Sequence, residues 1–172
     1  MKPPPFERQG LLDSDVIDFT PELRAQASEV LKAWDRWPLF TPPSERGAVQ
    51  IPGNVGGADW GGAGFDPATG MLYVPSLTSP IIVQLVKGDP ARGNLQYRRG
   101  GTQNLPTLDG IPLYKPPYSR VTAYDLNAGT IAWQVPLGDG TRNHPLLKDL
   151  KLGPLGTGVR ATFAWPFATE PN

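Results

Sequence analysis

Apolar side chains recur at helical spacing in one stretch near the start of the chain. The stripe is made by Leu23, Ala27, Val30, Leu31 and Trp34. Residues three and four apart share one face of a helix, so this spacing predicts an amphipathic helix packed against a larger body. Thr20 supplies an N-cap hydroxyl, and Pro21 suits the first helical position. Pro38 predicts that the helix ends before it.

After residue 38 the apolar positions come in short runs separated by Gly- and Pro-rich stretches, which is typical of β-strands joined by turns. The runs predict single strands over 48–51 and 81–86, a strand–turn–strand unit over 64–75, and a second hairpin with strands 120–124 and 130–135. In the first hairpin, Gly70 is predicted to take a positive φ. Residues 87–119 are predicted to be a long irregular excursion, and residues from 138 onward to be loop-like.

The composition supports this pattern. The 172 residues include 20 Gly and 21 Pro, which leaves little room for long helices and favours short strands and turns. Disorder is the alternative cause of such a composition. The apolar residues are clustered in patterns rather than dispersed, and this favours an ordered fold.

Charge and residue types exclude several classes of protein. Sixteen basic and sixteen acidic residues balance to zero without a basic stripe, so nucleic acid is not an expected partner. The absence of cysteine excludes disulfides and thiolate metal sites. No run approaches the roughly 20 apolar residues of a membrane-spanning helix. The first ten residues lack the apolar centre of a signal peptide; alone this would suggest a cytosolic protein, but it means nothing if the chain is an internal segment.

Two ten-residue segments are similar to each other. Residues 65–74 read FDPATGMLYV, and residues 124–133 read YDLNAGTIAW. Each has an aromatic residue, an Asp, three further residues, a Gly and then a β-prone run. The recurrence of one hairpin at this distance indicates the repeated sheets, or blades, of a β-propeller. Two unrelated hairpins with the same turn chemistry are the alternative.

The second copy resembles the tryptophan-docking repeat of the quinoprotein alcohol and glucose dehydrogenases, which carry pyrroloquinoline quinone (PQQ). That repeat runs Ala-x-Asp-x-x-(Thr/Ala)-Gly-x-x-x-Trp, and residues 123–133 read AYDLNAGTIAW. In the family the Trp docks between neighbouring blades, where a large flat ring buries much area at low entropy cost. Trp133 takes this place here, whereas Val74 stands there in the first copy.

The likeness is collinear over residues 2–156. It includes KPPPFERQG at 2–10, LFTPP at 39–43, GGADWGG at 56–62, KPPY at 115–118 and TRNHP at 141–145. Within the family, these segments most resemble the membrane-linked dehydrogenases of the glucose or quinate type. The resemblance implies a mainly β fold with one N-terminal helix. Residues 1–38 would form a Pro-rich lead-in and this helix, residues 39–156 about two blades of an eight-bladed β-propeller, and residues 157–172 an atypical tail.

The chain also departs from the family. Family members have several hundred residues, and their catalytic Asp, calcium ligands and many quinone contacts precede the region that this chain resembles. We therefore predict no catalytic residue and no metal ligand here. The likeness fades after Gly156, and residues 157–172 lack the apolar strand expected next, which points to a truncated or frameshifted gene.

Asp59, Trp60 and Gly61 are the predicted cofactor-binding residues. In alcohol-oxidising relatives, an Asn-Trp pair in the matching Gly-rich loop lies close to the quinone. Asp59 replaces that Asn, and an ionised acid cannot donate a hydrogen bond to an anionic cofactor, so its contact would need a metal, a cation or water. Trp60 either flanks the site or packs between blades. Gly57, Gly61 and Gly62 either let the backbone approach a ligand or simply turn the chain.

Other polar residues fit structural roles better than catalytic ones. His144 is the only histidine of the chain, and no nucleophile pairs with it. Arg142 in the same loop is no better a candidate, and Lys115, among prolines, is expected to anchor its loop. Ser76 and Ser119 lack triad partners at a recognisable spacing. The sequence also shows no phosphate-binding Gly loop and no cluster of metal-ligand residues.

The resemblance implies oxidation of an alcohol or sugar, of glucose or quinate type, with PQQ as cofactor and calcium as Lewis acid. The expected partners are a small-molecule substrate and a quinone or cytochrome electron acceptor, and the expected location is the periplasm, in association with the inner membrane. The chain alone is expected to be inactive, and its open sheet edges and unmatched apolar faces predict self-association. The alternatives are a non-catalytic binding or scaffold module built from the same repeats, without affinity for quinone, and a small stand-alone β domain.

Overall fold

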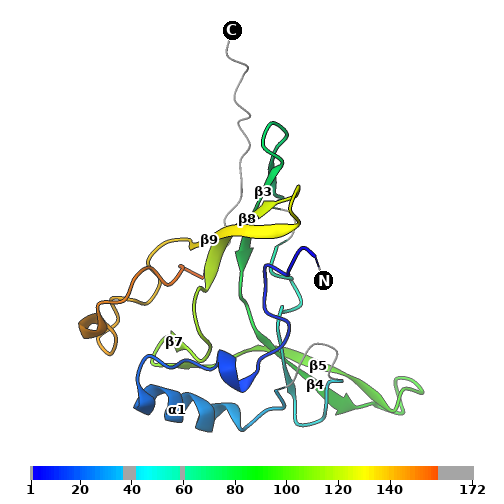
Figure 1. Cartoon of the computed structure of the whole chain (residues 1–172). Coiled ribbons are helices and arrows are strands. Elements are labelled where there is room, and N and C mark those ends of the chain that lie inside the picture. The colour runs from blue at the N-terminus through cyan, green and yellow to red at the C-terminus, as the bar shows by residue number, and fades with distance from the viewer. Residues whose placement is uncertain (1, 37–41, 59–60, 159–172) are drawn as a thin grey trace.

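The computed structural model describes residues 2–36, 42–58 and 61–158. Within these residues strands dominate and one α-helix lies near the start, which confirms the mainly β prediction (Figure 1). The elements in chain order are η1 (Asp13–Asp15), α1 (Pro21–Leu31), β1 (Ala48–Gln50), β2 (Gly64–Asp66), β3 (Met71–Leu77), β4 (Ile81–Lys87), β5 (Tyr97–Asn104), β6 (Thr107–Leu108), β7 (Ile111–Pro112), β8 (Ser119–Asp125), β9 (Thr130–Pro136) and η2 (Lys148–Leu150), where η marks a short 3₁₀ turn.

Helix α1 begins where the sequence predicts and ends before Pro38. The Thr20 side chain accepts a hydrogen bond from the Leu23 N–H at 3.2 Å, and Pro21 occupies the first turn. The stripe residues Leu23, Ala27 and Leu31 are buried in the core. In the described parts of the chain, no helix is both long and apolar enough to cross a bilayer.

Strands β2, β3, β8 and β9 form one four-stranded antiparallel sheet, in that order. Its two halves are the two hairpins that repeat in the sequence. All seven residues of β3 pair with β8, from Met71 opposite Asp125 to Leu77 opposite Ser119. The interpretation of the repeat as one hairpin per blade is therefore wrong, because both hairpins belong to a single sheet of the four-stranded kind that makes one blade. Their turns match because both hairpins reverse direction at the same end of this sheet.

The two turns use the chemistry that the sequence predicts. The Asp66 carboxylate accepts a backbone N–H bond and a bond from the Thr69 hydroxyl at 2.6 Å, and the Asp125 carboxylate accepts two backbone N–H bonds. Gly70 and Gly129 have φ angles of +73° and +67°. The hydrogen bond from Thr69, followed by the backbone bond, lowers the pKa of Asp66. Both turns are thus held by local hydrogen bonds in which the Asp carboxylate is the acceptor.

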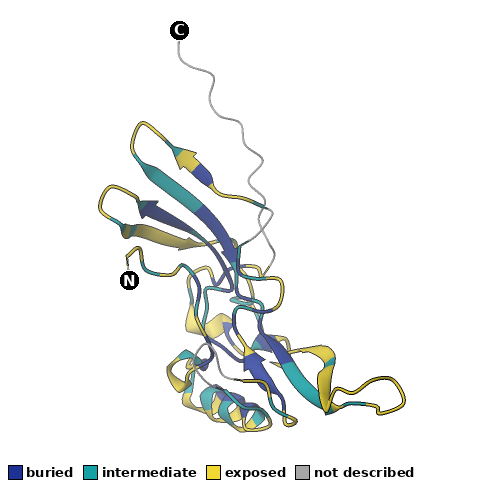
Figure 2. Cartoon of the chain, turned by 90° about the vertical axis from the view of Figure 1, so that its right-hand side faces the viewer, coloured by how far each residue is buried: buried dark blue, intermediate teal, exposed yellow. Residues whose placement is uncertain are grey.

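Strands β1, β4 and β5 form a three-stranded antiparallel sheet, and β6 pairs with β7. The prediction that residues 87–119 are irregular is wrong where β5, β6 and β7 lie. Strand β5 shows no alternation of apolar and polar residues, because its backbone pairs with the apolar β4 while its side chains stay exposed. The β4–β5 hairpin extends away from the rest of the chain, and its tip is exposed (Figures 1 and 2).

The hydrophobic core lies in the lower part of the molecule, between α1, the segment before it, the three-stranded sheet and the Pro-rich stretch 105–118 (Figures 1 and 2). Its fully buried side chains include Leu11, Ile17, Leu31, Ile82 and Leu113. The apolar stripe of α1 therefore packs against a larger body, as predicted.

A buried ion pair joins the N-terminal segment to the four-stranded sheet. Arg120 of β8 donates to Glu7 Oε2 at 2.5 Å, and the two side chains are 3% and 5% exposed. The Thr78 hydroxyl also donates to Glu7 at 3.0 Å. Arg120 donates further bonds to the Pro117 carbonyl at 2.8 Å and to the Ser76 hydroxyl at 3.2 Å. The pair thus connects the N-terminal segment, the end of β3, β8 and the last residues before β8.

The N-terminal segment covers one face of this sheet. The Tyr124 hydroxyl donates to the Pro4 carbonyl at 2.7 Å. Val74, Thr122 and Tyr124 project toward this side and are buried. The face is therefore shielded by a chain segment that contributes no strand to the sheet.

Removing one partner of the ion pair should destabilise the fold strongly. Arg120→Met leaves the Glu7 carboxylate buried without its cation, so we expect the free energy of unfolding to fall by about 3–5 kcal/mol. Urea unfolding followed by circular dichroism measures this loss. The double variant Glu7→Gln with Arg120→Met serves as the control and should recover part of the stability. A double variant that loses the full sum of the two single effects would contradict a coupled pair.

Candidate functional site

The long connections of the chain meet at one end of the four-stranded sheet. The opposite end carries the two tight turns. At the first end lie residues 51–58 and 61–63, which precede β2, residues 78–118 between β3 and β8, and residues 137–158 after β9. Functional residues concentrate on loops that a rigid scaffold positions. This end is therefore the candidate functional face.

Backbone hydrogen bonds tie these connections to the sheet and to one another. The Leu77 N–H donates to the Gly57 carbonyl at 2.8 Å, and the Thr78 N–H donates to the Tyr118 carbonyl at 2.9 Å. The Tyr118 N–H donates to the Leu155 carbonyl at 2.8 Å. The loops on this face thus have defined positions although they contain little regular secondary structure.

A cavity of about 660 Å³ opens on this face. Its walls come from residues 77–80 after β3, from the 104–118 stretch and from the 139–141 and 156–158 segments. Its lining includes three prolines and two leucines, and Asn104, Thr107 and Thr141 bring polar groups to it. A hollow that combines apolar walls with a few polar groups is typical of a small-molecule site.

Two tyrosines form the inner wall of this cavity. Their rings meet edge to face, with centroids 5.5 Å apart. The Tyr114 hydroxyl donates to the Thr78 carbonyl at 3.0 Å, whereas the Tyr118 hydroxyl approaches Thr141 without a well-formed hydrogen bond. Burial raises the pKa of Tyr114 to about 12 and raises that of Tyr118 further. Both hydroxyls therefore stay protonated at neutral pH, and the Tyr114 hydroxyl acts as a donor rather than as a base.

The described residues around the cavity do not by themselves fit PQQ or calcium. An anionic quinone needs cations or N–H donors, and calcium needs several oxygen ligands. Asp139 is the one ionisable acid among the described lining residues, and it pairs with Arg142 at 3.3 Å. No group of three or more His, Cys, Asp or Glu in the described ranges could hold a metal ion. We therefore derive no catalytic step from this cavity.

Of the three predicted cofactor residues, the structure describes only Gly61. Asp59 and Trp60 lie outside the described residues. Gly61 follows directly and is half-buried. Gly57 packs so closely against Glu7 that an added Cβ would lie 3.1 Å from Glu7 Cγ. The Gly-rich loop therefore needs this glycine for close packing on the buried ion pair, and its cofactor role stays a prediction.

The other polar residues have structural partners. His144 Nδ1 accepts the Leu146 N–H at 3.2 Å, and Lys115 pairs with Asp18 at 2.6 Å. The Ser119 hydroxyl, fully buried, donates to a backbone carbonyl. These contacts give the side chains structural roles, and the expectation that none of them is catalytic stays a prediction.

Sequence reasoning missed both the Glu7–Arg120 pair and the two-tyrosine cavity. The ion pair joins residues 113 positions apart, and the cavity is assembled from segments that read only as Pro-rich loops. Local spacing contains no signal for contacts of this kind.

The face of the four-stranded sheet opposite the N-terminal segment, called the open sheet face below, is partly exposed. Tyr73 and Trp133 lie on either side of Ala123 in one row of the sheet, and their rings are 5.8 Å apart. The small Ala123 lets the two rings meet above it. Trp133 is 42% exposed, so its outer side is free to pack against another surface.

Comparison with known proteins gives one family and several relatives. Residues 1–169 match the family described as "PQQ: Glucose/ethanol/alcohol dehydrogenase, beta-propeller domain". The quinate/shikimate dehydrogenase (quinone) of Acinetobacter baylyi is 28% identical over 97% of this chain and 23% of its own length. The glycerol dehydrogenase large subunit of Gluconobacter thailandicus is 31% identical over 62% of this chain and 18% of its own length. The quinoprotein glucose dehydrogenase A of Acinetobacter calcoaceticus is 26% identical over 70% of this chain and 17% of its own length. The chain thus spans less than a quarter of the length of these relatives.

A single methyl group should disrupt the cavity wall. Gly156 has a φ of +82°, and an added Cβ would lie 2.4 Å from the Ser119 backbone, so we expect Gly156→Ala to cost at least about 1–3 kcal/mol. Gly153→Ala is the matched control, because a Cβ there meets no atom within 4 Å. Limited proteolysis of residues 137–158 compares the two. Equal protection from the protease in both variants would show that the close contact of Gly156 with the Ser119 backbone does not hold the cavity wall in place.

Proposed function

Because the chain belongs to the β-propeller family of the PQQ-dependent glucose, ethanol and alcohol dehydrogenases, we propose that it forms part of an enzyme that oxidises an alcohol or sugar, of glucose or quinate type, and passes the electrons to quinone. The observation that carries this proposal is the extent of the likeness, which covers 97% of the chain in the quinate/shikimate dehydrogenase. A scaffold protein that shared only the repeated hairpins with these dehydrogenases would resemble them over those hairpins alone.

The chain spans less than a quarter of the length of its relatives, so we propose that it supplies only part of the enzyme. We propose that it supplies a section of the propeller wall and one edge of the cofactor pocket, on the face where the long connections meet. A bound PQQ would supply the electron acceptor for oxidation of the hydroxyl. The residues proposed to lie along it are Asp59, Trp60 and Gly61. Calcium, if the whole enzyme holds it, takes its ligands from residues outside this chain.

Location and partners follow from the same proposal. The relatives' printed names give quinate, shikimate, glycerol and glucose as substrates and quinone as an acceptor. We propose the periplasm, beside the inner membrane, as the location of the enzyme. The substrate and the electron acceptor would then reach the face that holds the cavity.

A chimera tests the proposed function. The matching segment of the Acinetobacter baylyi quinate/shikimate dehydrogenase is replaced by residues 2–158, and PQQ-dependent quinate oxidation is measured. We expect activity within about tenfold of the parent, because the likeness to the replaced segment extends over 97% of this chain. Asp59→Asn in the chimera should tighten PQQ binding, because an amide can donate a hydrogen bond where a carboxylate cannot. A chimera that folds but binds no PQQ would favour the scaffold alternative.

The chain alone should self-associate through its open sheet face. Tyr73, Trp133 and Val135 present apolar surface there, and Val135 is 47% exposed. Sedimentation velocity of the isolated chain should show oligomers, and Trp133→Ser with Val135→Thr should shift it toward the monomer. Leu146→Ser with Leu150→Ser, two exposed apolar residues outside this face, is the matched control and should leave the oligomers unchanged. A monomeric, cooperatively unfolding parent chain would contradict the expectation.

A further inference from the structure

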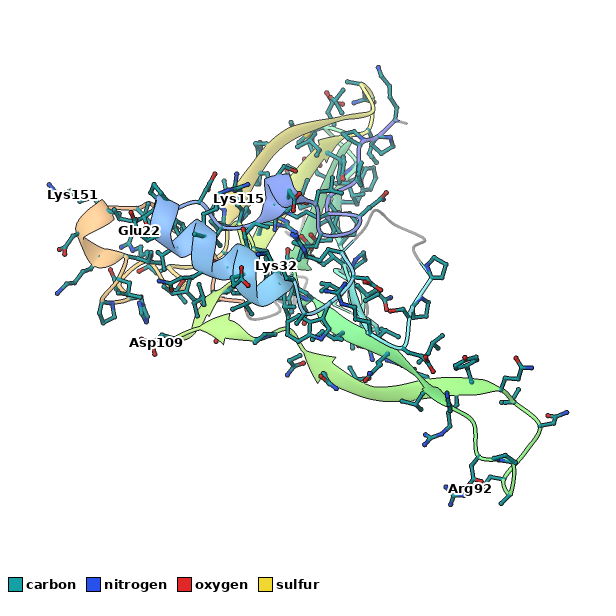
Figure 3. All side chains as sticks on the ribbon, turned by 90° about the horizontal axis from the view of Figure 1, so that it is seen from below. Glu22, Lys32, Arg92, Asp109, Lys115 and Lys151 are labelled. Atoms are coloured by element: carbon teal, nitrogen blue, oxygen red, sulfur yellow. The ribbon has the colours of Figure 1, made fainter. Side chains whose placement is uncertain are left out.

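The β4–β5 hairpin stands apart from the rest of the chain. It extends from the core, and Arg92 lies at its far end (Figures 1 and 3). In the described parts of the chain, β5 pairs only with β4, and its side chains are exposed along almost its whole length. The hairpin therefore presents a surface that neither the core nor the four-stranded sheet uses.

The hairpin concentrates the positive charge of a neutral chain. Residues 81–104 contain four basic residues and one acidic residue, a formal charge of +3, whereas the whole chain carries zero. Arg8, Arg36 and Arg120 elsewhere have acidic partners. The four basic residues of the hairpin form no ion pair among the described residues; they are Lys87, Arg92, Arg98 and Arg99.

Apolar side chains accompany these charges. Leu95 is 69% exposed and Tyr97 is 46% exposed. Lys87 lies opposite Tyr97 in the strand register, and Leu95 borders a small hollow of about 180 Å³ together with Arg92 and Arg98. Two guanidinium groups thus lie beside an exposed aliphatic side chain, and a lysine lies opposite an exposed aromatic residue.

The hairpin tip has a defined shape. The Gly88 N–H donates to the Gln96 carbonyl at 2.8 Å, and a Cβ on Gly88 would collide with the Leu95 carbonyl. The Asp89 carboxylate accepts the Ala91 N–H at 2.9 Å and is thus held by its own loop. Asp89 offsets one of the four positive charges, and the net formal charge of +3 remains available to an anionic partner.

We propose that the β4–β5 hairpin binds the surface of a bilayer that carries anionic headgroups. The guanidinium groups would contact lipid phosphates, and Leu95 and Tyr97 would enter the interfacial layer, where aromatic and aliphatic side chains beside basic ones are favoured. A projecting tip reaches a flat surface without steric obstruction from the rest of the chain. An acidic protein partner would match the charge but would leave the exposed Leu95 unexplained. The inference does not depend on PQQ chemistry, so it can fail while the proposed function stands.

Vesicle co-sedimentation of the chain tests this inference. We expect binding to phosphatidylcholine vesicles that contain phosphatidylglycerol, no binding to pure phosphatidylcholine, and a loss of binding at high salt. The triple variant Arg92→Gln, Arg98→Gln and Arg99→Gln should lower the partition coefficient by about a hundredfold, at about fivefold per charge. The matched control neutralises three exposed lysines elsewhere, with Lys32→Gln, Lys148→Gln and Lys151→Asn, and should change binding far less. Equal losses in the two triple variants, or no binding to anionic vesicles, would overturn the proposal.

A site-specific label identifies the segment that meets the lipid. Because the chain has no cysteine, Leu95→Cys can carry a polarity-sensitive dye, and Lys151→Cys serves as the control position. Anionic vesicles should shift the emission of the Leu95→Cys label to the blue and leave the Lys151→Cys label unchanged. A shift at the control position alone would show that another surface binds. Circular dichroism of each variant distinguishes lost binding from lost folding.

Discussion

The buried contact between Arg120 and Glu7 is the constraint on which the arrangement of this chain depends. Arg120 belongs to the four-stranded sheet, and Glu7 belongs to the segment that precedes the helix and the core. A charge taken out of water must keep its partner and its remaining hydrogen bonds. The N-terminal segment is therefore held against one face of the sheet, and the core that follows it is held near the same end.

The same contact supports the candidate functional face. Glu7 packs under Gly57 of the Gly-rich loop, and Arg120 binds the carbonyl of Pro117 where the long excursion returns to the sheet. Two of the three connections on this face thus rest on one ion pair. The third connection, after β9, is held by a backbone hydrogen bond from the Tyr118 N–H to the Leu155 carbonyl. The geometry of the face is consequently set by buried polar contacts rather than by regular secondary structure.

The sequence could predict what depends on local chemistry. The capped helix, the Asp-to-Gly turns and the apolar strands each arise from residues within a few positions of one another, and the structure confirms them. Strand β5 has no apolar periodicity, and the joining of the two hairpins into one sheet depends on pairing between β3 and β8 across a long excursion. The cavity and the ion pair are likewise long-range. Asp59 and Trp60, inferred from family likeness, lie outside the described residues and stay predictions.

The excursion between β3 and β8 has a consequence for how this kind of protein diversifies. It leaves the sheet at Leu77 and returns at Ser119, and these two residues face each other in the strand register. An insertion with adjacent ends can be lengthened, shortened or exchanged while the pairing on either side is unchanged. The excursion contributes two of the segments that line the cavity and the whole projecting hairpin. A change confined to this excursion can thus reshape the cavity lining and the projecting hairpin together, while the strand pairing of the four-stranded sheet is kept.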